Sequence, residues 1–279
     1  MSRRIWLIAL TALWLSGPAQ AELVLGVHPF KPATRLVDAF APLTQYLSNK
    51  LGQPVTLRIS QDYQTHIDAT GQNTYDIAYL GPSLYVKVRD AHGERPLLAR
   101  QRIGEKPVFH SKIFVRADSP VKDLAGLDGK RFAFGDPKST MGHLVPRYQL
   151  WQAGITVNRL AGYRFVGDHV NIALGVLAGE FDAGAVKEDV FYQYENRGLR
   201  AIATSAPISD HLFVASSTLS PALVRKLRGI MLAMHQDPKG REALQAVTAG
   251  INALVPVQDS DYDSLRAVLK KLHELGVRD

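Results

Sequence analysis

Cysteine is absent from this chain of 279 residues. Its absence excludes disulfide bonds, thiolate metal ligands and lipid attachment through a cysteine. Long apolar runs are equally scarce, since the only one lies within the first 21 residues. No lysine- or arginine-rich run is dense enough to form a nucleic-acid-binding face. We therefore expect a soluble mature protein, held together by its core, with no nucleic-acid partner.

The common catalytic signatures are missing as well. The sequence contains no G-x-S-x-G elbow, no Walker loop and no H-E-x-x-H helix. Its nine histidines do not fall at metal-ligand spacings. We therefore predict a protein that is not an enzyme and that uses neither a metal ion nor a cofactor.

The one long apolar run has the layout of a secretory signal. Arg3 and Arg4 precede the apolar stretch, and the small residues of Ala19-Gln20-Ala21 suit a cleavage site after Ala21. The run is shorter than the ~20 apolar residues that span a bilayer, which disfavours a membrane anchor. Loss of the two arginines lowers the formal net charge from +7 to +5. This mild positive charge favours anionic partners.

Strand patterns alternate with helix patterns along the rest of the chain. The expected strands are ELVLGV, VTLRIS, YDIAYL, KRFAF, YRFV and FDAGAV, each followed by a helical segment. Such alternation indicates βαβ units and mainly parallel sheets. It is interrupted once and resumes, which indicates two α/β lobes. We predict that residues 22–115 and 210–279 form lobe one and residues 116–209 form lobe two. Chain crossings near Val115–Ser119 and Pro207–His211 would form a hinge beside a ligand cleft.

The stretch GDPKSTMGHLVP, residues 135–146, joins a predicted strand to a predicted helix. The first amide groups of a helix have no internal partner and carry partial positive charge. Together with the hydroxyls of Ser139 and Thr140, they could surround an oxyanion. Hydroxyl residues at this position also commonly cap a helix, contributing about 1 kcal/mol. The residues alone leave both interpretations open.

Other polar residues also follow predicted strands. Tyr63 would be a donor in the cleft or a half-buried structural residue. His169 would donate to an anion or simply start a solvated helix. Asp189 and Asp210 would hold a cationic group of the ligand or lie in solvent. For Ser83, in AYLGPSLY, a plain turn and helix cap is favoured.

Taken together, these motifs resemble those of the periplasmic phosphonate-binding proteins of bacterial ABC transporters, within the wider phosphate, phosphite and phosphonate-binding family. The similar stretches are the DY at 62–63, DIAYLG at 76–81, VRADSPVKDLAGL from 115, GDPKSTMGHLVP and GDHVNIALGVLAGEFDAGAV. The resemblance implies a two-lobed class II periplasmic binding protein fold that closes on its ligand. It also implies a periplasmic location and a membrane protein as partner.

The resemblance further implies roles for individual residues. Ser139 and Thr140, with nearby backbone amides such as that of Gly142, would hold the phosphonate oxygens. Tyr63 would donate to the same group from the other lobe, and His169 would donate as well.

In the same way, Asp189 and Asp210 match positions that hold the amine of an aminoalkylphosphonate. Three residues depart from the family pattern. Met141 replaces a hydroxyl residue, His110 replaces a tyrosine, and Asp189 is one methylene shorter than the usual glutamate.

From these features we predict a monomeric periplasmic solute-binding protein. It would capture a phosphonate, phosphite or phosphate in the inter-lobe cleft and deliver it to an ABC permease. The alternative is an oxyanion-sensing partner of a histidine kinase or diguanylate cyclase. If His110 or His169 must be protonated to bind a dianion, affinity should fall as pH rises through about 6.5.

Overall fold

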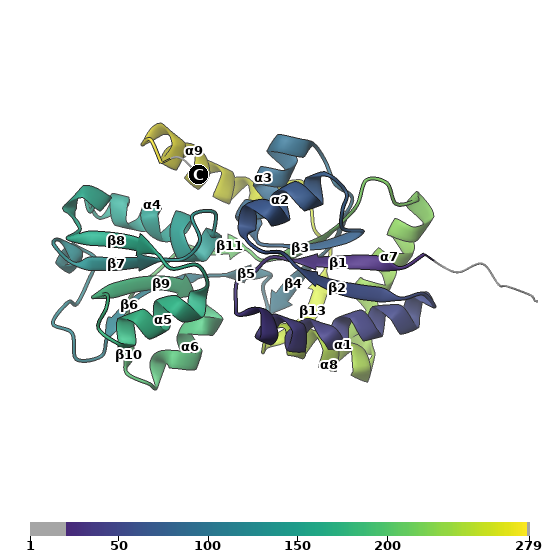
Figure 1. The fold of residues 1–279 in the computed structure, drawn as a ribbon, viewed down its shortest axis with the longest axis horizontal. Coiled ribbons are helices and arrows are strands. Elements are labelled where there is room, and N and C mark those ends of the chain that lie inside the picture. The colour runs from purple at the N-terminus through teal and green to yellow at the C-terminus, as the bar shows by residue number, and fades with distance from the viewer. Residues whose placement is uncertain (1–20, 278–279) are drawn as a thin grey trace, which may run out of the picture.

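The computed structural model describes residues 21–277. Two α/β lobes lie side by side, each built on its own sheet (Figure 1). The predicted two-lobed α/β architecture is therefore confirmed, but both sheets are mixed and not mainly parallel as expected. Nearly all of the predicted secretory signal lies outside the described residues. Within residues 21–277, no helix is long and apolar enough to cross a membrane.

Lobe one is built on a six-stranded sheet with the order β13-β4-β12-β3-β1-β2. Its strands are β1 (Leu23–Val27), β2 (Val55–Ile59), β3 (Ile77–Leu80), β4 (Leu97–Ile103), β12 (Leu212–Ala215) and β13 (Ile251–Val255). Its helices are α1 (Ala33–Leu51), α2 (Tyr63–Gly71), α3 (Pro82–His92), α7 (Pro221–Ala233) and α8 (Pro238–Val247). The apolar LVLGV of β1 is almost fully buried, as expected for a central strand covered by helices on both faces.

Lobe two is built on a five-stranded sheet with the order β10-β6-β9-β7-β8. Its strands are β6 (Ser111–Arg116), β7 (Arg131–Phe134), β8 (Gly162–Phe165), β9 (Ala183–Lys187) and β10 (Leu199–Thr204). Its helices are α4 (Val145–Gln152), α5 (His169–Leu177) and α6 (Glu188–Glu195). Short 3-10 turns occur in lobe two at Ala125–Leu127 and Val157–Arg159, and in the C-terminal part of the chain at Met234–Gln236 and Asp259–Tyr262.

The two lobes are joined by a pair of short strands, β5 (Val108–Phe109) and β11 (Ile208–Ser209). These strands pair with each other in antiparallel orientation between the lobes (Figure 1). The first crossing therefore comes earlier than the expected Val115–Ser119, because β6 already pairs with β9 and β10 in the second sheet. We therefore propose that lobe two begins directly after β5.

The final helix, α9 (Asp263–Glu274), adds a third link between the lobes. It packs against α3 of lobe one and against α4 of lobe two. The ammonium group of Lys271 lies 5.2 Å from the centre of the Trp151 ring on α4. Met141 and Val145 also cross the boundary, because both pack into the apolar core of lobe one. The lobes thus meet in an extensive contact around the cleft.

Candidate functional site

A small cavity lies between the lobes, at the carboxyl ends of parallel strands from both sheets. Ligands bind at this edge in open α/β sheets. The cavity is lined by buried residues only: His28, Phe30, Tyr63, Gly81, Leu84, Phe109, Ser139, Thr140, Met141, His169, Lys187 and His211. Its volume of about 10 Å³ is enough for roughly one water molecule. A molecule larger than water does not fit this cavity unless the lobes move apart.

The lobe-two side of the cavity starts with a π-helical turn, Thr140–Leu144, that leads into α4. The hydroxyl of Ser139 accepts a hydrogen bond from the amide of Gly142 at 3.1 Å, so Ser139 caps this turn. Pro146 has no amide proton and so cannot donate a hydrogen bond to the carbonyl oxygen of Met141. That oxygen instead accepts a hydrogen bond from Ser111 Oγ at 2.9 Å. Ser139 therefore caps a helix and also lines the cavity, and the two interpretations of the motif are compatible.

The hydroxyl of Thr140 reaches across to lobe one. Thr140 Oγ1 accepts from the amide of Ser83 at 3.0 Å and donates to Ser83 Oγ at 2.8 Å. Ser83 Oγ in turn donates to the carbonyl of Lys138 at 2.6 Å. We call this set the Ser83–Thr140 latch. Ser83, for which a plain cap was favoured, thus takes part in holding the lobes together.

His169 begins α5, where the carboxylate of Asp168 accepts from two amides of the first turn. The Nδ1 atom of His169 accepts from the amide of Lys187 at 3.2 Å. In the neutral ring Nε2 must therefore carry the proton, and it lies 3.3 Å from Ser139 Oγ. Burial, and next the charge of Lys187, lower the pKa of His169 to about 3. His169 is thus a neutral donor and needs no protonation to contact an anion.

Tyr63 faces the cavity from lobe one. It is the first residue of α2, whose start is capped by Asp62 accepting from Thr65 N at 2.7 Å. Burial raises the pKa of Tyr63, and a hydrogen bond with Ser139 opposes this only in part. Tyr63 therefore keeps its phenolic proton and remains available as a donor.

A buried cation that the sequence did not reveal also lines the cavity. Lys187, at the end of β9, is 3% exposed. Its ammonium group lies 3.2 Å from the Asp189 carboxylate, and that of Lys31 lies 3.7 Å from the same carboxylate. Burial alone would raise the pKa of Asp189, but the two lysines hold it below its usual value. The three groups together carry a net charge of about +1.

The remaining predicted residues lie just outside the cavity lining. Asp210 Oδ1 accepts from Gln101 Nε2 at 2.7 Å and from the amide of His211 at 2.7 Å. Its Oδ2 atom is buried and has no hydrogen-bond partner within residues 21–277. His110 donates its amide to Glu188 at 3.1 Å, while its neighbour Phe109 lines the cavity. Alternate side chains of an extended segment point in opposite directions, which explains why Phe109 lines the cavity and His110 does not.

Three polar residues of the cavity lining were not singled out as site residues from the sequence. They are Lys187, His28 and His211. Lys187 is the last residue of β9, and His28 directly follows β1. A polar residue at the carboxyl end of a strand was therefore the sequence signal that could have identified them.

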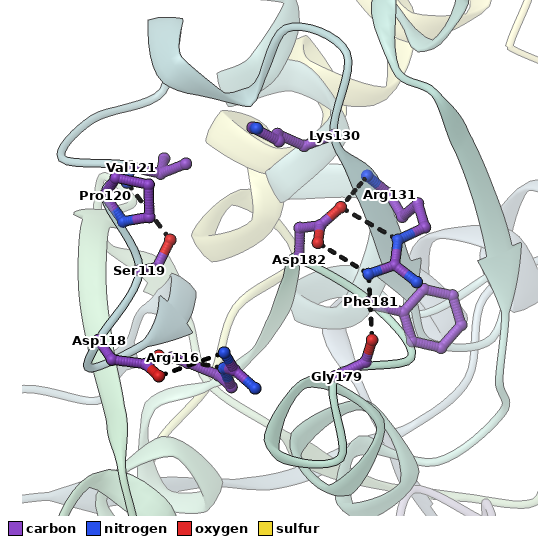
Figure 2. Close-up of a pocket in the computed structure, with 10 residues that line it drawn as sticks. All are labelled: Arg116, Asp118, Ser119, Pro120, Val121, Lys130, Arg131, Gly179, Phe181 and Asp182. Carbon is purple, nitrogen blue, oxygen red and sulfur yellow. Dashed lines mark hydrogen bonds and ion pairs between the residues drawn. The ribbon is translucent and has the colours of Figure 1, made fainter.

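A larger surface pocket of about 210 Å³ lies at the opposite end of the second sheet, where β7 and β9 begin (Figure 2). Four of its five charged side chains pair with one another. Arg131 contacts Asp182 at 2.9 Å, and Arg116 contacts Asp118 at 3.1 Å. Because these charges are satisfied and exposed, the inter-lobe cavity is the better candidate for a binding site.

Known proteins resemble this chain over most of its length. The profile of a family described as "ABC transporter, phosphonate, periplasmic substrate-binding protein" matches residues 25–262. The chain is 28% identical over 272 residues to the phosphate-import protein PhnD of Mycolicibacterium smegmatis, covering 88% of this chain and 84% of that protein. It is 30% identical over 274 residues to the probable ABC transporter phosphite binding protein PhnD1 of Prochlorococcus marinus MIT 9301, covering 91% and 90%.

Solved structures show the same fold. The structure of PhnD1 from Prochlorococcus marinus in complex with methylphosphonate matches with a TM-score of 0.82. It covers 90% of this chain and 98% of that chain, at 21% identity in this alignment. A phosphonate-transporter binding protein from Pseudomonas aeruginosa also matches with a TM-score of 0.82, at 19% identity, covering 92% and 89%. The predicted two-lobed periplasmic binding protein fold is confirmed by these neighbours.

Proposed function

Because the chain belongs to the family of periplasmic substrate-binding proteins of phosphonate ABC transporters, we propose that it binds a small phosphorus oxyanion in the inter-lobe cavity and delivers it to a membrane permease. One observation carries this proposal. The buried ammonium group of Lys187 and the donors of Ser139, His169 and Tyr63 converge on the same cavity from both lobes.

The number of donors suits a charged ligand. A hydrogen bond to a charged group is worth about 1.5–3 kcal/mol. Several such bonds support micromolar binding, about −8 kcal/mol, after the costs of ordering and desolvation are subtracted. The Ser83–Thr140 latch would then stabilise the closed form that a permease recognises.

The charge pairing favours a ligand without an amine. Asp189 already pairs with Lys187 and Lys31, and Asp210 does not line the cavity. An ammonium group on the ligand would have to compete with Lys187 for Asp189. Phosphate, phosphite and methylphosphonate are therefore preferred over 2-aminoethylphosphonate. The relatives named for phosphate and phosphite support this class.

A thermal-shift panel of phosphate, phosphite, methylphosphonate, 2-aminoethylphosphonate and sulfate tests the proposal. A ligand at 100 times its Kd adds about 2.7 kcal/mol to stability, which raises the Tm clearly. No shift with any phosphorus oxyanion would contradict the proposal.

Variants locate the site. Ser139→Ala removes a helix cap and a cavity hydroxyl together, and we expect it to weaken binding about tenfold or more. Ser220→Ala is the matched control, because Ser220 caps α7 by accepting from Leu223 N at 3.3 Å but does not line the cavity. Both variants should lose similar stability, and only the first should lose affinity. Equal affinity in both would place the site elsewhere.

Delivery to a permease is tested in cells. Deleting the gene should abolish growth on the best ligand as the sole phosphorus source. Normal growth of the deletion strain would instead favour the sensing role.

A further inference from the structure

The lobe-one side of the cavity presents two histidines whose proton positions are set by their partners. The Nδ1 atom of His28 lies 3.2 Å from the carbonyl oxygen of Tyr79. A carbonyl oxygen only accepts hydrogen bonds, so Nδ1 must carry the proton. The Nε2 atom of neutral His28 is then an acceptor. It points toward Gly81 at the cavity, where an added Cβ would lie 3.5 Å from it.

His211 is arranged in the same way. Its Nδ1 lies 2.9 Å from Asp210 Oδ1, an oxygen that also accepts from Gln101 and from the His211 amide. Nδ1 of His211 is therefore the donor and Nε2 is an acceptor. Nε2 would lie 3.6 Å from the same added Cβ on Gly81. The two rings stack with their centres 5.6 Å apart, so both acceptors reach one part of the cavity.

Both rings are neutral at pH 7. Burial lowers the pKa of His28 well below its usual value, and burial also lowers that of His211. Asp210 opposes the change at His211 without reversing it. The titratable and charged groups that face the two rings are His66, Tyr63, Tyr79, His169, Lys187, Asp189 and Asp210.

The two sides of the cavity are thus chemically different. Lobe two offers donors, namely the hydroxyl of Ser139, Nε2–H of His169 and the ammonium of Lys187. Lobe one offers two nitrogen lone pairs beside a single donor, the hydroxyl of Tyr63. A fully deprotonated oxyanion would place an oxygen against those lone pairs, which leaves buried acceptors unsatisfied. A ligand with one protonated oxygen would satisfy both sides.

We propose that this protein binds its oxyanion in a protonated form, with a P–OH group donating to Nε2 of His28 or His211. These two histidines would then select protonated phosphorus oxyanions against sulfur oxyanions of the same shape, which carry no proton. The inference rests on the proposed function and adds the protonation state of the ligand to it.

Methylphosphonate and methanesulfonate form a matched pair for the test. Near pH 6 both are tetrahedral monoanions of nearly the same size, and they differ by one proton. Calorimetry should give at least tenfold tighter binding of methylphosphonate. Equal affinity for the two would overturn the inference while leaving the oxyanion-binding function in place. Failure of every oxyanion to bind would instead overturn the proposed function.

A variant pair tests the acceptor itself. His28→Phe removes the lone pair, and the carbonyl of Tyr79 keeps a donor from His66 Nε2 at 3.1 Å. We expect methylphosphonate affinity to fall about tenfold and methanesulfonate affinity to change less than threefold. His28→Gln, which retains an acceptor, should restore part of the preference. An equal loss for both ligands in His28→Phe would overturn the role of His28 as an acceptor.

Proton uptake gives a readout on the unmodified protein. Near pH 8.5 methylphosphonate is mostly a dianion, so binding as the monoanion should take up about one proton. Calorimetry in buffers of different ionisation enthalpy measures this number. Uptake near zero would overturn the inference. Uptake accompanying methanesulfonate binding would also overturn it, because the histidines rather than the ligand would then be protonated.

Discussion

Replacing Gly142 with alanine adds one methyl group at the most crowded point of the site. A Cβ on Gly142 would lie 2.9 Å from Ser139 Oγ, 3.2 Å from Gly135 Cα and 3.3 Å from His169 Cε1. Gly142 is not among the glycines with positive φ, so alanine is compatible with the backbone. The perturbation is therefore steric, and it displaces the Ser139 hydroxyl and the His169 ring.

The expected magnitude follows from two opposing effects. Overpacking typically costs about 1–3 kcal/mol. Alanine favours a helix over glycine by up to about 1 kcal/mol. The free energy of unfolding should therefore fall by roughly 0–2 kcal/mol, a modest change. Affinity should fall by a larger factor, about 10- to 100-fold, because two donors to the anion move together.

Gly229→Ala is the matched control. Gly229 lies on the exposed face of α7, and no atom lies within 4 Å of its added Cβ. This variant should gain about 0.5–1 kcal/mol of stability and keep its affinity. Calorimetry with methylphosphonate and thermal unfolding measure both quantities. Wild-type affinity in Gly142→Ala would refute the placement of the anion beside this turn.

Three further predictions concern the latch, the cation and the histidines. Ser83→Ala should weaken methylphosphonate binding about 2- to 10-fold by loosening the closed form, measured by calorimetry and small-angle scattering. Lys187→Met should weaken binding about 100-fold or more and cost up to about 3 kcal/mol of unfolding free energy, since Asp189 keeps Lys31. Burial lowers the pKa of His28, His66, His169 and His211, that of His169 to about 3, so these four side chains take up protons more readily after unfolding. Each should therefore remove up to about 1.4 kcal/mol of stability per pH unit below about 6.5, and a Tm that is constant from pH 7 to 5 would contradict this.

Most of the fold follows from local patterns in the sequence. Leu36, Phe40 and Leu43 have the spacing of one helix face, and all three are fully buried in α1. The first crossing lies earlier in the chain than predicted, because the place of β6 in the fold depends on strands that are distant in the sequence. It pairs with β9 and β10, and no pattern within Ser111–Arg116 reveals that pairing. Two lobes were thus predictable, and so was the second crossing near Pro207–His211, where β11 lies, whereas the position of the first crossing was not.

The part of the candidate site that lies just after strand ends was predictable from the sequence. Ser139, His169 and Tyr63 follow strands, and the fold brings all three to one cavity. The burial of Lys187 depends on the packing of Phe30, 5.0 Å from its ammonium group, which lies far away in the sequence. The tautomers of His28 and His169 depend likewise on backbone groups of β3 and β9. These properties arise only when the sheets and lobes come together.

The charge of the cavity and its hydrogen-bond acceptors favour the same ligand. Lys31, Lys187 and Asp189 leave a net charge of about +1, which matches a monoanion better than a dianion. A phosphonate or phosphate that has become a monoanion necessarily carries a P–OH group. The acceptors of His28 and His211 are suited to that proton. The pairing of Asp189 with both lysines thus explains why an acid at this position is compatible with an anion site. It halves the positive charge and thereby favours the protonated form of the ligand.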